Sequence, residues 1–174
     1  QLLSMRPDVV PEALINELRK LQESVLPNDF EQVRPIIESE LGAPLEEVFE
    51  SVEEVAVAGA SMAQVHFAVL KETGESVAIK VLRPGLEKIV EADFDILMWF
   101  ARQAHEHLEE LKPFDLPGVA ETLRKGMEKE LDFRYEARSM AFFALQNPYP
   151  ETVHVPKVYE DYSSKCVLVM ERID

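Results

Sequence analysis

The stretch from residue 52 to residue 81 constrains the fold most, because it is rich in β-branched residues and is divided by a single polar turn. The turn, KETGES at residues 71–76, places Gly74 between two apolar runs. β-Branched side chains favour strands, and a short polar turn with a glycine joins strands into a hairpin. The stretch therefore predicts two or three antiparallel strands.

Helical patterns precede this hairpin. Apolar residues recur at helical spacing over residues 11–25, and a second pattern runs from Asp29, a candidate N-cap, to Gly42. Pro35 lies inside that second pattern and predicts a kink or a break, because proline lacks the N–H that a helix interior needs. A short third helix is expected after Pro44.

Helical patterns also follow the hairpin, over residues 85–111 and again over residues 118–145. The last segment of the chain predicts two more strands around a turn at Ser163 and Ser164. Helices, a hairpin, further helices and a second hairpin, in this order, predict an α+β domain with an antiparallel sheet.

Composition narrows the class of protein. The 174 residues are 47% hydrophobic, which is enough for a core, and the net charge of -15 argues against a general nucleic-acid surface. Cys166 cannot form an internal disulfide, so it favours a reducing compartment and is itself expected to be a buried structural thiol. No apolar run is long enough to span a bilayer. Both ends of the chain look cut, so we expect a portion of a longer protein.

The hairpin carries a spaced set of small residues. In protein kinases the pattern G-x-G-x-x-G-x-V precedes a strand with V-A-I-K, whose Lys holds the α and β phosphates of the nucleotide. Here Ala58, Ala60, Ala63 and Val65 take the spacing of the three glycines and the valine, and residues 77–80 read VAIK. The spacing matches this nucleotide-binding pattern, whereas the residue type of the loop does not.

Alanine in place of glycine changes what such a loop can do. Glycine tolerates positive φ and lets backbone N–H groups approach phosphate, whereas the alanine Cβ hinders both. We therefore expect the loop to hold phosphates differently or more loosely, with Gly59 as its one flexible point. On the strand, Ala78 leaves room for a flat ring that Val65 could cover, while Lys80 reaches past it.

Two interpretations of Lys80 stay open. VAIK alone favours an ordinary strand with a solvated lysine at its end, whereas the paired loop spacing favours a phosphate site. A kinase lysine also needs a carboxylate on a following helix. On a regular helix Glu130 and Asp132 diverge by about 200°, so they cannot both face one site, and a solvated acidic face is the competing interpretation for each carboxylate. The candidates are Glu128, Glu130, Asp132 and Glu136.

With these motifs together, the sequence resembles the UbiB family of atypical kinase-like proteins, also called aarF-domain or ADCK proteins. The family's K-x-G-Q and L-S-x-R-P-D phrases resemble the opening QLLSMRPDVVP, in which Gln1 would end the first motif. Its A-A-A-S loop resembles residues 58–61, with Gly59 in place of a family alanine. AQVHFAVL, VAIKVLRPG, KELDFRYEA and VPKVY resemble further family phrases, so the resemblance covers nearly all of the chain.

The resemblance implies a protein-kinase-like N-lobe, that is, a small antiparallel sheet with an αC-type helix, to which N-terminal and inserted helices are added. Residues 1–50 would form a helical K-x-G-Q-type extension, truncated at its N-terminus and packed over the mouth of the nucleotide site. Residues 51–174 would form the N-lobe, with a helical insertion at 85–112. The C-lobe, with the catalytic-loop Asp and Asn and the metal-binding Asp, would lie outside this chain.

The resemblance also implies roles for individual residues. Lys80 and Glu136 would be the catalytic pair, in which Glu136 orients Lys80. Glu130 and Asp132 match the family's E-x-D motif, which faces the extension and its Gln1. The backbone of the last residues would form a hinge against the adenine edge. The residues expected to surround the nucleotide are Ala58, Gly59, Ala60, Ser61, Val65, Ala78, Lys80, Glu171 and Ile173.

For function, the resemblance implies an intact protein that binds ATP or ADP with Mg²⁺ and hydrolyses ATP or transfers phosphate slowly, the metal ligands coming from the C-lobe. It would support biosynthesis of ubiquinone or related isoprenoid lipids, with such lipids or biosynthesis proteins as partners. It would lie at the cytoplasmic face of a bacterial membrane, or in a eukaryotic mitochondrion or plastid, through parts outside this chain. The fragment alone would show little or no turnover.

Two other functions remain open. A pseudokinase-like scaffold would bind nucleotide or lipid without chemistry, and the apolar residues of the opening phrase at positions 2–10 motivate it. An ordinary protein kinase acting on a protein substrate is disfavoured, because the glycines of its loop are missing.

Overall fold

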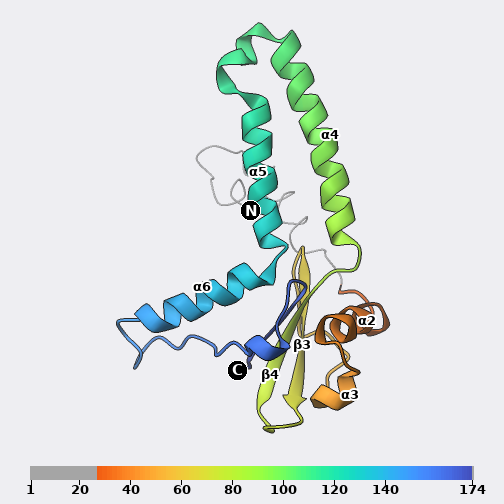
Figure 1. Cartoon of the computed structure of the whole chain (residues 1–174), viewed down its shortest axis with the longest axis vertical. Coiled ribbons are helices and arrows are strands. Elements are labelled where there is room, and N and C mark those ends of the chain that lie inside the picture. The colour runs from red at the N-terminus through yellow and green to blue at the C-terminus, as the bar shows by residue number, and fades with distance from the viewer. Residues whose placement is uncertain (1–26, 174) are drawn as a thin grey trace, which may run out of the picture.

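The computed structural model describes residues 27–173 (Figure 1). The predictions for Gln1 and for the helix at residues 11–25 lie outside the described residues. The α-helices are α2 (Phe30–Leu41), α3 (Leu45–Val48), α4 (Leu86–His107), α5 (Leu116–Glu130) and α6 (Phe133–Gln146), and the 3-10 helices are η2 (Glu109–Phe114) and η3 (Glu160–Tyr162). The strands are β1 (Phe49–Val52), β2 (Ala58–Gly59), β3 (Ala63–Leu70), β4 (Ser76–Leu82) and β5 (Val167–Glu171).

The strands form one antiparallel sheet in the order β1-β3-β4-β5, and the short β2 pairs with β3. This confirms the predicted α+β class and the hairpin at residues 52–81, whose turn places Gly74 at a φ of 72°. In the register of the sheet, Lys80 lies opposite Val65 on β3 and Leu168 on β5. The register therefore brings the residues of the predicted nucleotide pattern onto adjacent strands.

The two faces of the sheet carry different layers. Because side chains alternate along a strand, Val77, Ile79 and Val81 point to one face and pack with Val33 and Ile37 of α2, all of them fully buried. The opposite face carries Ala78, Lys80 and Leu82, and its smaller core includes two residues from the junction of α5 and α6. That smaller core consists of Ala63, Leu82, Leu131, Phe133 and Leu168.

The described part of the N-terminal extension belongs to the larger core. α2 and α3 contribute Val33, Ile37 and Leu45 to it, and both helices lie on one side of the sheet (Figure 1). Because Lys80 alternates with Ile79 and Val81 along β4, this side is opposite Lys80. The expected division between residues 50 and 51 falls inside β1. Residues 27–50 therefore share one core with the sheet.

Pro35 does not break its helix. α2 runs without interruption from Phe30 to Leu41, with Pro35 exposed in its interior, and it ends at Gly42 in the left-handed region at a φ of 69°. Asp29 stands at the N-cap without a side-chain cap bond. The burial of Val33 and Ile37 against the sheet outweighs the hydrogen bond that proline cannot donate, so the predicted break is wrong.

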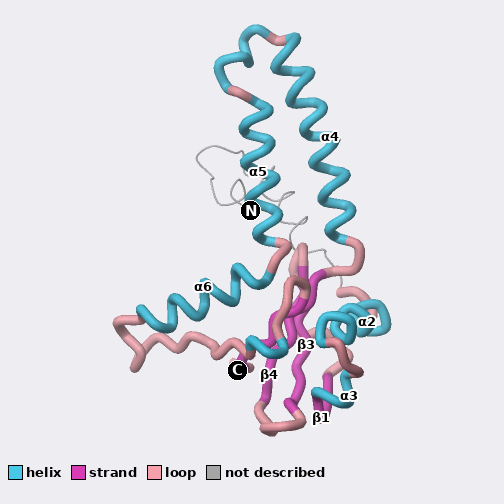
Figure 2. Tube along the Cα trace, in the orientation of Figure 1, coloured by secondary structure: helices cyan, strands magenta, loops and turns pink. Residues whose placement is uncertain are grey.

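A helical hairpin projects from the sheet. α4 and α5 run side by side, and η2 joins them at the far end (Figure 2). Asp115, at a φ of 41°, caps α5 by accepting a hydrogen bond from the Gly118 N–H. The hairpin is thus longer than the insertion expected at residues 85–112. No helix within residues 27–173 is both long enough and apolar enough to cross a bilayer.

The single helix predicted over residues 118–145 is wrong, because the chain forms two helices there. Leu131 and Asp132 leave the helical path, and Asp132 has an extended backbone with φ -130° and ψ 97°. The Asp132 carboxylate accepts the Arg134 N–H at 3.0 Å and so caps α6, while Leu131 is buried against the sheet. Glu130 and Asp132 therefore do not lie on one regular helix.

The final hairpin is only partly formed. β5 is present, but the first of the two predicted strands is reduced to an isolated bridge between Val158 and Met170, followed by the 3-10 turn η3. Ser163 occupies its expected turn, and its hydroxyl donates to the Tyr159 carbonyl at 2.7 Å. Side-chain bonds of this kind compete with strand pairing, which explains the difference.

Candidate nucleotide-binding site

Lys80 and Glu136 meet on the face of the sheet opposite α2. Lys80 comes from β4 and Glu136 from the first turn of α6, and the lysine Nζ donates to the carboxylate oxygens Oε1 and Oε2 at 2.8 and 2.7 Å. The Lys80 side chain is 25% exposed and that of Glu136 40% exposed. The pair is therefore fixed in geometry yet reachable from solvent, which is what a lysine that binds phosphate requires.

The other candidate carboxylates lie elsewhere. Glu130 is exposed at the end of α5, and Asp132 forms a double hydrogen bond with the Arg134 guanidinium at 2.8 and 2.6 Å. Glu128 lines a separate cavity described below. Of the four candidates, the structure brings Glu136 to Lys80.

Asp132 is a structural carboxylate in this arrangement. Its hydrogen bond with Arg134, the same residue whose N–H it caps, holds the pKa of the Asp132 carboxyl below its ordinary value. The expected contact between the E-x-D residues and Gln1 involves a residue outside the described part of the chain. That contact stays a prediction.

Phe133 also contacts Lys80, and the sequence alone does not predict this contact. Its ring centroid lies 4.9 Å from the Lys80 Nζ, within the range of a cation–π contact. Phe133 is buried, and its N–H donates to the Lys165 carbonyl at 3.0 Å. An aromatic residue at the start of the helix that carries the partner carboxylate is the signal that could have indicated it.

The strands beside Lys80 form an apolar floor. Ala78 is buried, and its neighbours across the sheet are Phe67 on β3 and Met170 on β5. Val65 lies opposite Lys80 and is half-buried. Since alternate residues share a face, Val65, Phe67 and Ala78 lie on the same face as Lys80, where a flat ring could rest on the small Ala78 side chain.

The alanine loop lies beside the first residues of β3, with which β2 pairs. Residues 58–61 are exposed, and the Ala60 N–H donates to the Ala63 carbonyl at 2.8 Å, which tightens the turn into β3. Gly59 lies in β2 opposite Gln64, and the glycines of residues 27–173 with positive φ are Gly42, Gly74 and Gly85. Gly59 therefore keeps a conformation that alanine also adopts.

The expected hinge follows β5. The N–H groups of Glu171 and Arg172 already donate to the carbonyls of Lys157 and Ser76, at 2.8 and 3.2 Å. The Glu171 carboxylate accepts the Lys157 N–H, and this bond, followed by that with His154, holds its pKa below the ordinary value. Ile173 is exposed. An adenine edge at this point would therefore have to use other backbone groups than those two N–H groups.

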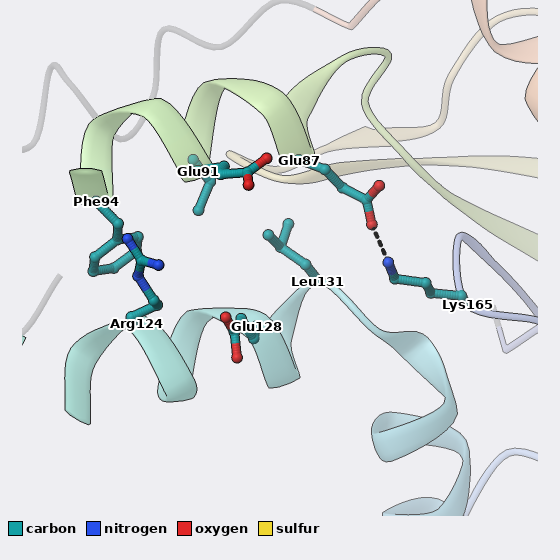
Figure 3. Close-up of a pocket in the computed structure, with 8 residues that line it drawn as sticks. Glu87, Glu91, Phe94, Arg124, Glu128, Leu131 and Lys165 are labelled. Atoms are coloured by element: carbon teal, nitrogen blue, oxygen red, sulfur yellow. Dashed lines mark ion pairs between the residues drawn. The ribbon is translucent and has the colours of Figure 1, made fainter. Parts of the chain in front are cut away.

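A separate cavity of about 280 Å³ lies between the base of α4 and the end of α5 (Figure 3). Glu87 and Lys165 form an ion pair at its rim, with 2.5 Å between oxygen and nitrogen. Lys80 does not line this cavity, so it is distinct from the site on the sheet. Its lining residues are Glu87, Val90, Glu91, Phe94, Arg124, Glu128, Leu131 and Lys165.

The family of this chain follows from its similarity to known proteins. The model of the ABC1 atypical kinase-like domain matches residues 20–174. The chain belongs to the ABC1 atypical kinase-like family. This confirms the resemblance drawn from the alanine loop, the VAIK strand and the flanking phrases.

Curated relatives of this ABC1 domain are named probable protein kinase UbiB. The protein from Cellvibrio japonicus is 40% identical over 173 residues, which cover 99% of this chain and 31% of that protein. The protein from Azotobacter vinelandii is 39% identical over 173 residues and is covered to 32%. This chain thus spans about a third of the length of the relatives it matches.

A solved structure shares the fold of the ABC1 domain. It is that of Rv3197 from Mycobacterium tuberculosis in complex with erythromycin, with a TM-score of 0.69 and 29% sequence identity. The match covers 99% of this chain and 43% of that one. The small antiparallel sheet with its added helices is therefore the N-lobe arrangement of an ABC1-type protein.

Proposed function

We propose that this ABC1 domain is the nucleotide-binding N-lobe of a UbiB-type atypical kinase or ATPase. The observation that carries the proposal is the Lys80–Glu136 pair, with both carboxylate oxygens within 2.8 Å of Nζ, beside the apolar floor at Val65 and Ala78. A lysine held in this way presents a fixed positive charge to phosphate. The apolar surface at Val65 and Ala78 would exclude water from the adenine ring.

Each residue has a role in this proposal. Lys80 binds the α and β phosphates, Glu136 orients Lys80, and the loop at residues 58–61 covers the phosphates. Ala78 and Val65 contact the adenine ring, and the backbone near Glu171 and Ile173 lies at its edge. Because the Lys80 and Glu136 side chains are both partly exposed, nucleotide could reach them without a large rearrangement.

Magnesium enters the proposal through residues outside this chain. Among residues 27–173 no group of three or more His, Cys, Asp or Glu side chains lies close enough to hold a metal ion. The ion would neutralise charge on the nucleotide phosphates once it is bound there. This chain's own contribution to the phosphates is Lys80 and the backbone of the alanine loop.

For the whole protein we propose ATP hydrolysis or slow phosphate transfer in support of ubiquinone or related isoprenoid-lipid biosynthesis. The family resemblance supports this role, as does the name of the UbiB relatives. We also propose membrane association through parts outside residues 1–174, at the cytoplasmic face of a bacterial membrane or in a eukaryotic organelle.

The experiment that tests the proposal measures ATP hydrolysis and ATP binding by the intact protein and its Lys80→Ala variant. Loss of the fixed positive charge should weaken ATP binding at least about tenfold, because a hydrogen bond between charged groups contributes about 1.5–3 kcal/mol. Lys112→Ala is the matched control, since Lys112 lies in η2 with an exposed side chain. Unchanged ATP binding and hydrolysis in Lys80→Ala would refute the assignment.

A small-molecule-binding scaffold without chemistry is the second candidate. The structure of Rv3197 favours it, because that protein of the same fold was solved in complex with erythromycin. The cavity at the base of α4 offers this chain a place for a small molecule apart from Lys80. Titration of the intact protein with erythromycin and with ATP separates the two, since a scaffold would bind one of them without any turnover of ATP.

A further inference from the structure

A single arginine ties the alanine loop to the segment that leads into α2. Arg83 is the first residue after β4, and its Nε donates to the Ala60 carbonyl at 2.9 Å. Its Nη1 donates to the Asn28 Oδ1 at 3.1 Å, and its backbone N–H donates to the Met62 carbonyl at 3.0 Å. The Arg83 side chain therefore holds Ala60 of the loop and Asn28 at the same time, while its backbone N–H holds Met62, the residue after the loop.

Asn28 is itself a fixed anchor. Its backbone N–H donates to the Gln64 Oε1 at 2.8 Å, and its carbonyl accepts from the Gln64 Nε2 at 3.0 Å. Its side-chain Nδ2 donates to the Gln32 Oε1 at 3.0 Å. Gln64 is fully buried and lies opposite Gly59 of the loop in the sheet register. Asn28 is thus held by a buried residue of β3 and not by side chains on the solvated surface alone.

The bond to Ala60 also determines where the next N–H points. The described chain has no cis peptide bond, and in a trans peptide the carbonyl and the following N–H point in opposite directions. Arg83 draws the Ala60 carbonyl toward Asn28, on the face of the sheet where α2 packs. The Ser61 N–H consequently points away from Arg83. Backbone N–H groups aimed in this way are what loops offer to phosphate.

We propose that Arg83 is a positioning residue that holds the alanine loop in its phosphate-binding geometry, with Asn28 as the anchor. The inference rests on the proposed nucleotide-binding function and adds to it a residue that does not touch the nucleotide. Arginine suits the task because its planar guanidinium donates in two fixed directions at once, which a lysine ammonium does not. In protein kinases the glycines of this loop let its backbone N–H groups approach phosphate closely. Here, where alanines replace them, Arg83 would orient the loop backbone instead.

The test compares ATP, ADP and adenosine binding to the intact protein and its Arg83→Gln variant. ATP and ADP should bind about tenfold more weakly to the variant, the effect of one charged hydrogen bond, whereas adenosine binding should stay within about twofold. Arg102→Gln on α4 is the matched control and should bind all three ligands normally. In a double-mutant cycle, Asn28→Ala should weaken ATP binding alone but add little to Arg83→Gln, because both break the same connection.

The outcomes separate this inference from the proposed function. If Lys80→Ala loses ATP binding while Arg83→Gln keeps it, the site stands and Arg83 has no positioning role. If neither substitution affects ATP binding, the proposed function itself fails. Equal weakening of ATP and adenosine by Arg83→Gln would indicate a general loss of structure and overturn the inference. Should Arg83→Gln not fold, Asn28→Ala must by itself weaken ATP binding and leave adenosine binding intact.

Discussion

Both carboxylate oxygens of Glu136 accept hydrogen bonds from the Lys80 Nζ, at 2.8 and 2.7 Å, although 56 positions separate the two residues in the sequence. The Phe133 ring lies 4.9 Å from the same Nζ. The lysine is thus held by one carboxylate and one aromatic face, both from the start of a single helix. Any movement of α6 would move the support of Lys80 with it.

Replacing Glu136 tests that dependence. Glu136→Gln keeps the shape of the side chain but removes the charge, so Lys80 should lose its fixed orientation and ATP should bind about tenfold more weakly. Isothermal titration of the intact protein measures the effect. Glu106→Gln, an exposed position on α4, is the control. Wild-type ATP affinity in Glu136→Gln would show that Lys80 does not need its partner.

Asp132 should stabilise the folded protein because it caps the N-terminus of α6. Asp132→Ala removes the acceptor of the Arg134 N–H at the start of α6, and losing an N-cap costs about 1 kcal/mol. Asp132→Asn keeps a capping oxygen and should lose less. Thermal unfolding of both variants checks the order, and equal destabilisation would mean that the cap is not the cause.

The charge of Asp132 adds a dependence on pH. Its pKa is lowered in the folded state, chiefly by Arg134, so the unfolded state binds the proton first as the pH falls. The stabilisation is therefore complete above the ordinary carboxyl pKa and is lost as the pH falls through the lower, folded value. Chemical unfolding across this acidic range should show a steeper loss for the wild type than for Asp132→Asn. A slope that Asp132→Asn leaves unchanged would contradict this.

We expect His66 to make the free energy of unfolding depend on pH in a second range, nearer neutrality. The ring is fully buried, with Nε2 2.9 Å from the Gln64 Nε2, Nδ1 2.8 Å from the Glu53 carbonyl and the Phe30 ring 5.1 Å away. The Gln64 amide nitrogen is a donor, so Nε2 must accept and the imidazole must be neutral. Burial accordingly lowers the pKa of His66.

The sign of this effect follows from linkage. Between the lowered pKa and the ordinary value near 6.5, the unfolded state binds a proton that the folded state does not, so the free energy of unfolding falls as the pH drops. We expect full stability above about pH 6.5 and a progressive loss below it. Denaturant unfolding of wild type and His66→Gln between about pH 7 and 5 measures this. A difference between the two proteins that does not change with pH would refute the prediction.

Cys166 should react slowly in the native protein. Burial, reinforced by nearby carboxylates, raises the pKa of its thiol to about 11, so little thiolate is present near neutral pH. A chromogenic thiol reagent should label the folded protein much more slowly than the protein unfolded in denaturant. Equal rates in both states would show that the thiol is accessible and its pKa ordinary.

Ile37 tests whether α2 belongs to the same cooperative unit as the sheet. Its side chain is fully buried in the core that α2 shares with Ile79 and Val169. Ile37→Ala should lower the free energy of unfolding by about 2–5 kcal/mol, as for other truncated core residues. A single unfolding transition that shifts as a whole is expected. Two separate transitions would mean that residues 27–50 unfold independently of the sheet.

The sequence identified much of the candidate site because its signals are local. The loop at residues 58–61, the VAIK strand and Glu136 were each recognised from spacing within one segment or from one family phrase. Phe133, Arg83, Asn28 and Gln64 were missed, because their contacts join segments that no periodicity connects. The break at Leu131 was missed as well, because the apolar pattern continues through it.

By itself, the sequence determined the α+β class, the central hairpin and the family, since β-branched runs, helical periodicity and short motifs depend on neighbouring residues. Only the tertiary structure decided that Phe133 and Arg83 support the site, that α2 continues through Pro35, and that the helix predicted over residues 118–145 divides at Asp132. The physical reason is the same in each case. These outcomes depend on burial against the sheet and on hydrogen bonds between distant segments, which outweigh local preference.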